Sequence, residues 1–393
     1  MSMHDEMKSG VVGSHQKSGS QPTSDGHPTS GARPLSSGHL EWSKAHGNVK
    51  YNLAVSGVTP CDVKLLSPSV DDFTMVADNE YGWQPLLDRI AARYCVGAEN
   101  VVLAHGTSMA NHLAFAALLE PGDQVLLESP GYDPLRVVPE YLQCDVRSFE
   151  RREEDRYRLD VDRIERALTQ RTKLVIVTNL HNPSGVLARR GELESLAQLA
   201  DTYDIHILMD EVYLEWVHGL GEPRSAINIS PRFVTTRSLT KVYGLAALRA
   251  GWILAAPALA QRMRKLNGLF TNSMAHPSER LAARALDAAD SLLAAGRERV
   301  LRNADLVTRF VESNQRLSWV RPDAGTVGFV RLDTGNVDEF IDYMLTEYDT
   351  LVVPGRFFGA PHHFRIGFGM NERVLAEGLR RLGSALAKLQ KAE

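Results

Sequence analysis

The sequence predicts an α/β protein with a large domain on a mostly parallel sheet and a smaller α+β domain near the C-terminus. Short, nearly continuous apolar runs, such as 173–179 and 205–209, alternate with segments of helical periodicity. This succession is typical of parallel strands buried under helices on both faces. From about residue 319 the pattern changes to shorter strands, which indicates a separate unit.

With 393 residues, the chain is long enough for about two domains. Residues 1–38 are rich in Ser, Gly, His, Gln and Pro and lack apolar periodicity, so we expect a disordered tail. We expect residues 39–75 to pack with the small domain, residues 76–300 to form the large domain, and residues 301–393 to form the small one.

In the large domain, apolar runs and periodicity predict the elements in order. Helices are expected over 86–94, 106–119, 161–168, 191–203 and much of 256–311, and strands over 101–104, 124–128, 145–149, 173–179, 205–209, 232–236 and 252–255. In the small domain we expect strands near 319–321, 326–332, 350–353 and 363–369, and helices near 336–343 and from about 372.

Charge and cysteine content exclude several classes of partner. The 44 Lys and Arg residues nearly balance the 48 Asp and Glu residues, which argues against nucleic-acid binding. No apolar run is long enough to span a membrane, so no membrane partner is expected. Cys61, Cys95 and Cys144 lack the spacing of a disulfide framework or a zinc site, so we expect no metal and a cytoplasmic location.

The most informative stretch surrounds Lys241. A lysine among apolar neighbours is desolvated, and its amine becomes available to attack a carbonyl. Ser238 lies three residues before it and Arg249 eight residues after it, and together a hydroxyl and a guanidinium can hold a phosphate. This combination suits a carbonyl cofactor that carries a phosphate. A lone lysine, by contrast, would be an ordinary exposed one.

Two further motifs follow buried strands. An Asn-Pro-Ser-Gly run at 182–185 follows the apolar run at 173–179, and Asp210 and Tyr213 follow the run at 205–209. Open α/β sheets bind ligands at the carboxyl ends of their strands. Taken singly, these residues are better explained as turn and cap residues.

The three motifs in this order resemble the fold-type-I pyridoxal-phosphate enzymes, specifically the class I/II aminotransferases, over about residues 50–390. The resemblance implies a seven-stranded-type sheet in a domain that binds pyridoxal 5′-phosphate. It implies that Lys241 holds the cofactor as an internal aldimine and moves the substrate's proton, while Asp210 pairs with the pyridine nitrogen. Tyr213 and Asn182 would hydrogen-bond the cofactor's phenolic oxygen, with Asn182 also near the substrate.

The resemblance also assigns cofactor contacts upstream. Gly106, Thr107 and Ser108 join a strand to a helix, where free backbone N–H groups suit a phosphate, although the last two could be simple N-caps. Tyr132 would stack on the pyridine ring; the alternative is a turn tyrosine. Tyr81 would reach the phosphate of a second subunit, but here Gln84-Pro85 replaces a glycine usual in the family, and an ordinary turn tyrosine is the alternative.

Two residues are expected at the substrate. Arg365, in an Arg-Ile-Gly-Phe context, would bind the α-carboxylate in a bidentate pair, unless it is an exposed strand residue. Gly57 would belong to a segment that closes over the substrate, although a plain turn glycine is as good an explanation. The stretch 268–275 lacks the arginine that one subgroup of the family uses for a distal carboxylate, which favours an apolar, aromatic or other neutral substrate.

The resemblance implies an aminotransferase that moves an α-amino group between an L-amino acid and a 2-oxo acid, acting as a homodimer with composite active sites. Enzymes of similar sequence instead catalyse elimination, decarboxylation, cyclisation or oxidation with the same cofactor. A non-catalytic regulator that binds pyridoxal phosphate is a third possibility. The short polar tail is no DNA-binding domain, and Lys241 and Arg365 are both present, which counts against a regulator.

Overall fold

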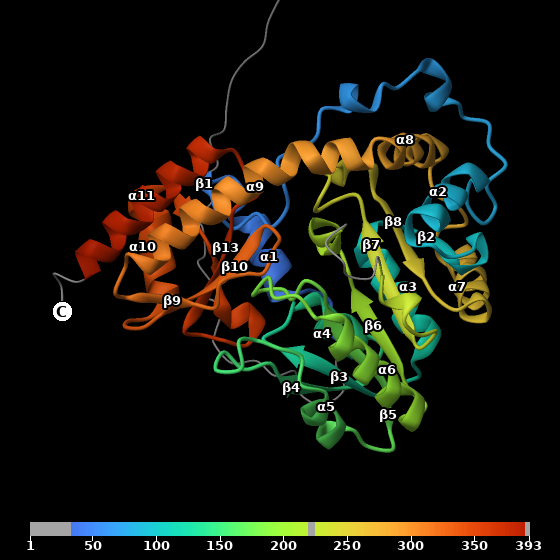
Figure 1. Cartoon of the computed structure of the whole chain (residues 1–393), viewed down its shortest axis with the longest axis horizontal. Coiled ribbons are helices and arrows are strands. Elements are labelled where there is room, and N and C mark those ends of the chain that lie inside the picture. Colours follow the sequence, from blue (N-terminus) through green and yellow to red (C-terminus); the bar gives the residue numbers. More distant parts are fainter. Residues whose placement is uncertain (1–32, 219–224, 390–393) are drawn as a thin grey trace, which may run out of the picture. The chain divides into compact units, whose positions relative to one another are not determined.

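The structure is a computed structural model that describes residues 33–218 and 225–389 (Figure 1). Residues from Pro34 onward form one compact unit. Most of the predicted tail, residues 1–32, lies outside the described residues. The end of that predicted tail is ordered, because Ser37 caps the first helix, α1 (Gly38–Ala45).

Within the described residues, the largest sheet has seven strands in the order β2-β8-β7-β6-β5-β3-β4. All neighbouring pairs are parallel except those of β8, which runs antiparallel to both β2 and β7. The strands are β2 (Val101–His105), β3 (Gln124–Ser129), β4 (Asp145–Glu150), β5 (Thr172–Thr178), β6 (His206–Asp210), β7 (Phe233–Ser238) and β8 (Ala250–Leu254). The predicted α/β class with a mostly parallel seven-stranded sheet is confirmed.

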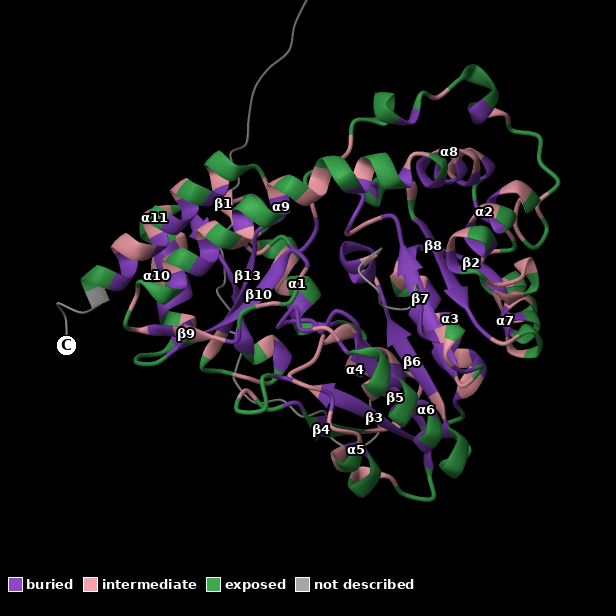
Figure 2. Ribbon diagram, viewed as in Figure 1, coloured by how far each residue is buried: buried purple, intermediate pink, exposed green. Residues whose placement is uncertain are grey.

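Helices cover both faces of this sheet because side chains alternate along each strand. In β5, Leu174 and Ile176 join the apolar cluster beneath α3 (Gly106–Leu118) and α7 (Pro257–Phe270). Val175 and Val177 face the other way and pack in the cluster of α5 (Val161–Ala167) and α6 (Arg190–Tyr203). Apart from the edge strand β4, the strands of this sheet are therefore buried along nearly their whole length (Figure 2).

Helices α2 (Gln84–Tyr94) and α8 (His276–Asp287) pack on each other beside β2. α9 (Ala289–Glu312) follows and is continuous through residue 300. The domain boundaries expected near residues 75 and 300 stay predictions.

The C-terminal part contains an antiparallel sheet of order β12-β13-β10-β9. Its strands are β9 (Leu317–Trp319), β10 (Val327–Leu332), β12 (Val353–Pro354) and β13 (His363–Gly367). The N-terminal strand β1 (Tyr51–Asn52) pairs in parallel with β11 (Thr350–Leu351). Helices α10 (Val337–Tyr348) and α11 (Glu372–Leu389) pack together alongside.

Local differences from the predicted elements have identifiable causes. The strand expected over 350–353 divides between two sheets, since β11 pairs with β1 and β12 with β13. Two helices were not predicted, α1 and α4 (Pro134–Tyr141). α1 buries one residue, His39, and α4 contains an internal proline, Pro139, so neither has a regular apolar pattern.

Candidate active site

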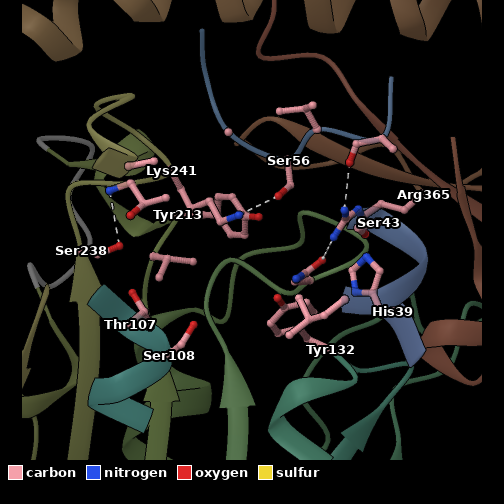
Figure 3. Close-up of a pocket in the computed structure, with 18 of the residues that line it drawn as sticks. His39, Ser43, Ser56, Thr107, Ser108, Tyr132, Tyr213, Ser238, Lys241 and Arg365 are labelled. Atoms are coloured by element: carbon pink, nitrogen blue, oxygen red, sulfur yellow. Dashed lines mark hydrogen bonds between the residues drawn. The ribbon is translucent and has the colours of Figure 1, made fainter. Parts of the chain in front are cut away.

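A cavity of about 630 Å³ lies where β5, β6 and β7 end and α3 begins. The N-terminal segment and Arg365 of β13 complete its wall (Figure 3). Most of the residues predicted from sequence line this cavity: Gly57, Thr107, Ser108, Tyr132, Asn182, Asp210, Tyr213, Ser238, Lys241, Arg249 and Arg365. Residues up to about 300 positions apart in sequence therefore meet at one place.

One end of the cavity is formed by the start of α3. The Oγ1 of Thr107 is buried and has no hydrogen-bond partner among the described residues. The guanidinium of Arg249 lies against Gly106, where a Cβ would come within 2.3 Å of Arg249 Nη2. A free hydroxyl, a nearby guanidinium and unpaired N–H groups at a helix start form a cradle for a phosphate.

Ser238 ends β7 beside this cradle, and its Oγ accepts a 3.4 Å hydrogen bond from the backbone N of Thr240. The loop that follows packs tightly against the N-terminal segment. At Gly244 the φ angle is +68°, and a Cβ there would lie 2.5 Å from the carbonyl oxygen of Thr59. This contact explains the glycine: it is required by the chain's own backbone.

Lys241 points into the middle of the cavity, where its Nζ donates a 2.9 Å hydrogen bond to the Oγ of Ser56. The next residue, Gly57, lies against the lysine backbone, since a Cβ on Gly57 would be 3.3 Å from the carbonyl oxygen of Lys241. The predicted N-terminal segment thus reaches the lysine. Its polar contact comes from Ser56, which the sequence did not single out.

Asp210 ends β6 and is 5% exposed. Its carboxylate accepts hydrogen bonds of 3.2 Å from Asn111 Nδ2 and from the backbone N of Val212. Burial raises the pKa of Asp210 to about 6, against the opposing effects of these hydrogen bonds and the charge of Lys241. A cationic partner, such as a protonated ring nitrogen, would restore the ionised form.

Arg365 is 3% exposed and lies opposite the phosphate cradle. Its Nη1 donates to Asn182 Oδ1 and its Nη2 to the carbonyl oxygen of Ala54, both at 3.1 Å. Its Nε is buried without a partner among the described residues. Desolvation lowers the pKa of Arg365. A buried guanidinium with an unpaired N–H is suited to a carboxylate ligand.

The two tyrosines predicted at the cofactor both line the cavity. Tyr213 is buried at the cavity wall, shortly after Asp210. Tyr132 also lines the cavity, and burial raises the pKa of its phenol, which therefore stays protonated at neutral pH.

Tyr81 does not line this cavity. It is 57% exposed and lies on the surface next to Glu99 and Arg264. Its predicted contact with the phosphate of a second subunit stays a prediction.

The cavity residues that the sequence analysis did not single out include His39, Ser56 and Asn111. Asn111 follows Thr107 by four residues on α3, and residues at this spacing share a helix face, so a signal existed. His39 and Ser56 come from the N-terminal segment, where no local pattern marks them.

Among the described residues, no cluster of three or more His, Cys, Asp or Glu side chains is placed to hold a metal ion. In the same part of the chain, no helix has the length and apolar character needed to cross a membrane.

Comparison with known proteins agrees with this geometry. Residues 81–382 match the family "Aminotransferase class I and II". The chain is 30% identical over 344 residues to capreomycidine synthase of Streptomyces vinaceus, covering 86% of this chain and 87% of that protein. It is 31% identical over 323 residues to the arginine–pyruvate transaminase AruH of Pseudomonas aeruginosa, covering 78% and 81% of the two chains.

Solved structures show the same fold. A PLP-dependent aminotransferase from Streptococcus suis superimposes with a TM-score of 0.84 at 25% identity, covering 89% of this chain and 97% of that one. The PLP-dependent cyclase OrfR superimposes with a TM-score of 0.81 at 26% identity, covering 91% and 98%.

The fold and the cavity define an α/β enzyme with a lysine facing a phosphate cradle. The chain belongs to the class I and II aminotransferase family. Its cofactor is accordingly pyridoxal 5′-phosphate. The residues present fit this cofactor, because Thr107 Oγ1 is unpaired and Gly106 leaves room for Arg249 at the phosphate end.

Proposed function

We propose that this protein is an aminotransferase, which moves an α-amino group from an L-amino acid to a 2-oxo acid. The observation that carries the proposal is that Lys241 and Arg365 line the same cavity. The Nε of Arg365 is also buried without a partner among the described residues. This provides an amine for proton transfer and a guanidinium for the substrate's carboxylate.

The bound cofactor supplies an electron sink, which lets the Cα–H bond of an amino acid break. In the proposed mechanism, the amine of Lys241 would take the proton from Cα and return it at C4′ of the cofactor. Ser56 orients this amine through the 2.9 Å hydrogen bond from its Nζ. Asp210 would hold the ring nitrogen in its protonated form, and Asn111 orients the carboxylate.

Substrate orientation would fall to Arg365. A carboxylate bound at its free edge is held beside Asn182, which already accepts from Nη1. The roles proposed for Tyr213 and Asn182 at the phenolic oxygen, for Tyr132 at the ring, and for Ser108, Ser238 and Arg249 at the phosphate are supported by their places on the cavity wall.

Cyclisation is the second candidate, because relatives named capreomycidine synthase and PLP-dependent cyclase are about as similar as the transaminases. A half-reaction distinguishes the two. Holoenzyme is mixed with single L-amino acids, without an oxo acid, and products are identified by mass spectrometry. Equal amounts of 2-oxo acid and pyridoxamine 5′-phosphate support amino transfer. A product that keeps its α-amine while losing water or closing a ring, with no aminated cofactor, overturns it.

We also propose a homodimer with composite sites. Several large apolar side chains between residues 63 and 81 are exposed: Val63, Leu65, Val70, Phe73, Met75, Val76 and Tyr81. Exposed large apolar side chains concentrated in one segment support an interface there. A cytoplasmic location is supported by Cys61, Cys95 and Cys144, which are free thiols.

A further inference from the structure

Helix α1 forms a part of the cavity wall that lies away from the places proposed for the cofactor and for the substrate's carboxylate. His39, Trp42 and Ser43 line the cavity from this helix. Their spacing of three and four residues places them on one helical face. In Figure 3, His39 and Arg365 lie on the side opposite Thr107, Ser108 and Ser238. By position, this face of α1 meets the substrate's side chain.

His39 is 4% exposed, yet its buried Nδ1 has no hydrogen-bond partner among the described residues. Its ring stacks on Phe357 at a centroid distance of 5.6 Å and meets the edge of Tyr132 at 5.5 Å. A buried polar group without a partner costs about 1–3 kcal/mol, so such groups normally have one. The missing partner is explained if it arrives with the substrate.

The position of His39 is fixed by the chain. Its backbone N donates a 3.3 Å hydrogen bond to Asp133 Oδ2, and Ser37, the cap of α1, also donates to that carboxylate. Asp133 directly follows Tyr132, so α1 is tied to the same loop that carries the proposed ring-stacking residue. The imidazole is thus held rigidly, as a recognition group must be.

The cavity also lacks a partner for a cationic side chain. Of the described residues that line it, Asp210 is the sole carboxylate, and its proposed partner is the cofactor's ring nitrogen. Burial, together with the charges of Arg365 and Lys241, lowers the pKa of His39 to about 3. The imidazole is therefore neutral at physiological pH, with one donor and one acceptor nitrogen.

We propose that His39 is a specificity-determining residue that hydrogen-bonds a neutral polar group on the side chain of the amino-acid substrate. The substrates so selected carry an amide, ureido or hydroxyl group. Cationic side chains are disfavoured, in contrast to the arginine named for one relative. This inference rests on the proposed amino-acid chemistry of the same cavity.

The test is binding selectivity, which does not require turnover. Holoenzyme is titrated with matched amino acids that differ in one polar group: glutamine against methionine, tyrosine against phenylalanine, and citrulline against arginine. Dissociation constants come from the absorbance change of the bound cofactor. In the parent protein we expect the neutral polar member of at least one pair to bind about tenfold or more tightly, and citrulline to bind better than arginine.

His39→Phe keeps the stacking on Phe357 but removes both nitrogen atoms, and it should reduce the glutamine–methionine or tyrosine–phenylalanine preference to about one. His39→Gln, which retains hydrogen-bonding groups, should keep part of it. His206→Phe is the matched control, because His206 lies at the opposite end of β6 from Asp210. If H39F does not give folded holoenzyme by circular dichroism, His39→Met carries the same expectation.

Three results would overturn the role of His39. The parent protein could show no binding preference, the folded apolar variant could keep the preference of the parent, or the variant could bind both members of a pair equally more weakly. Tighter binding of arginine than citrulline would overturn it too. Failure of the proposed function gives a different result. The binding preference is then present in the parent and is lost when His39 is replaced, but no 2-oxo acid forms. If the protein catalyses amino transfer but its binding preference does not change when His39 is replaced, this inference is wrong and the proposed function remains supported.

Discussion

Lys241 Nζ hydrogen-bonds Ser56 Oγ at 2.9 Å, although 185 positions separate the two residues in sequence. The contact connects the loop after β7, which carries Lys241, to the N-terminal segment. In the proposed mechanism, this hydroxyl would hold the free amine in one orientation.

Lys241→Ala should lower the rate of amino transfer by at least about 100- to 10,000-fold, since it removes the group that moves the proton. Folding should be unaffected, because the lysine makes one side-chain hydrogen bond in the described structure. Turnover and circular dichroism measure the two effects. Borohydride reduction of the parent holoenzyme should attach the cofactor to the peptide that contains Lys241. Labelling of another lysine would refute the assignment.

Ser56→Ala should lower kcat by about 2- to 10-fold, the usual net value of one hydrogen bond, with little change in KM. The reason is that the amine loses an orienting acceptor while the carboxylate site at Arg365 is untouched. The kinetic isotope effect with Cα-deuterated amino acid should increase as proton transfer becomes slower. An altered KM with unchanged kcat would mean that Ser56 acts on the substrate instead.

The raised pKa of Asp210 should make the stability of the cofactor-free protein depend on pH. Its folded pKa of about 6 lies above the usual value of about 3.9, so the folded state holds the proton more tightly between these pH values. Stability should therefore fall as pH rises through this window, by up to about 3 kcal/mol. Asp210→Asn removes this cost.

The test compares melting temperatures of the cofactor-free parent and D210N between pH 4 and pH 8. The advantage of the variant should be small at pH 4, grow as the pH rises to about 6, and level off above that value. A constant difference across this range would show that burial does not shift the pKa of Asp210.

Arg365→Lys should raise the KM for amino acids by about 100-fold, because an ammonium cannot form the two-pronged pair with a carboxylate and a buried charge pair is worth about 2–5 kcal/mol. Arg331→Lys, on the neighbouring strand β10 and exposed, is the matched control and should behave as the parent. Steady-state kinetics with a reactive amino acid provide the measurement. A KM within twofold of the parent would exclude Arg365 from the carboxylate site.

Met75→Glu should weaken the proposed dimer, because Met75 is 85% exposed within the apolar surface between residues 63 and 81, and a buried unpaired charge is costly. Light scattering after size-exclusion chromatography should show a shift from dimer to monomer. Leu301→Glu places the same charge on an exposed apolar residue of α9 and should have no effect. A monomeric parent would refute the dimer itself.

Much of the fold was predictable because strand and helix patterns are local. Buried runs such as 173–179 and 205–209 correspond to β5 and β6, and the polar residues after them lie at the cavity. Parallel strands bring their carboxyl ends to one edge of a sheet, so Asn182 and Asp210 were foreseeable as neighbours. α1 and α4 were not predicted, since their sequences lack a regular apolar stripe.

The sequence by itself determined the family, the cofactor and many of the residues that line the cavity, because those residues occur in short motifs at the ends of predictable strands. The tertiary structure decided which side chains complete the site from afar. Ser56 at Lys241, Asn182 at Arg365 and His39 beside Tyr132 are contacts that depend on how the N-terminal segment and the C-terminal strands pack against the large sheet. Such contacts leave no periodic trace in the chain, since they arise from long-range packing and not from local backbone preference.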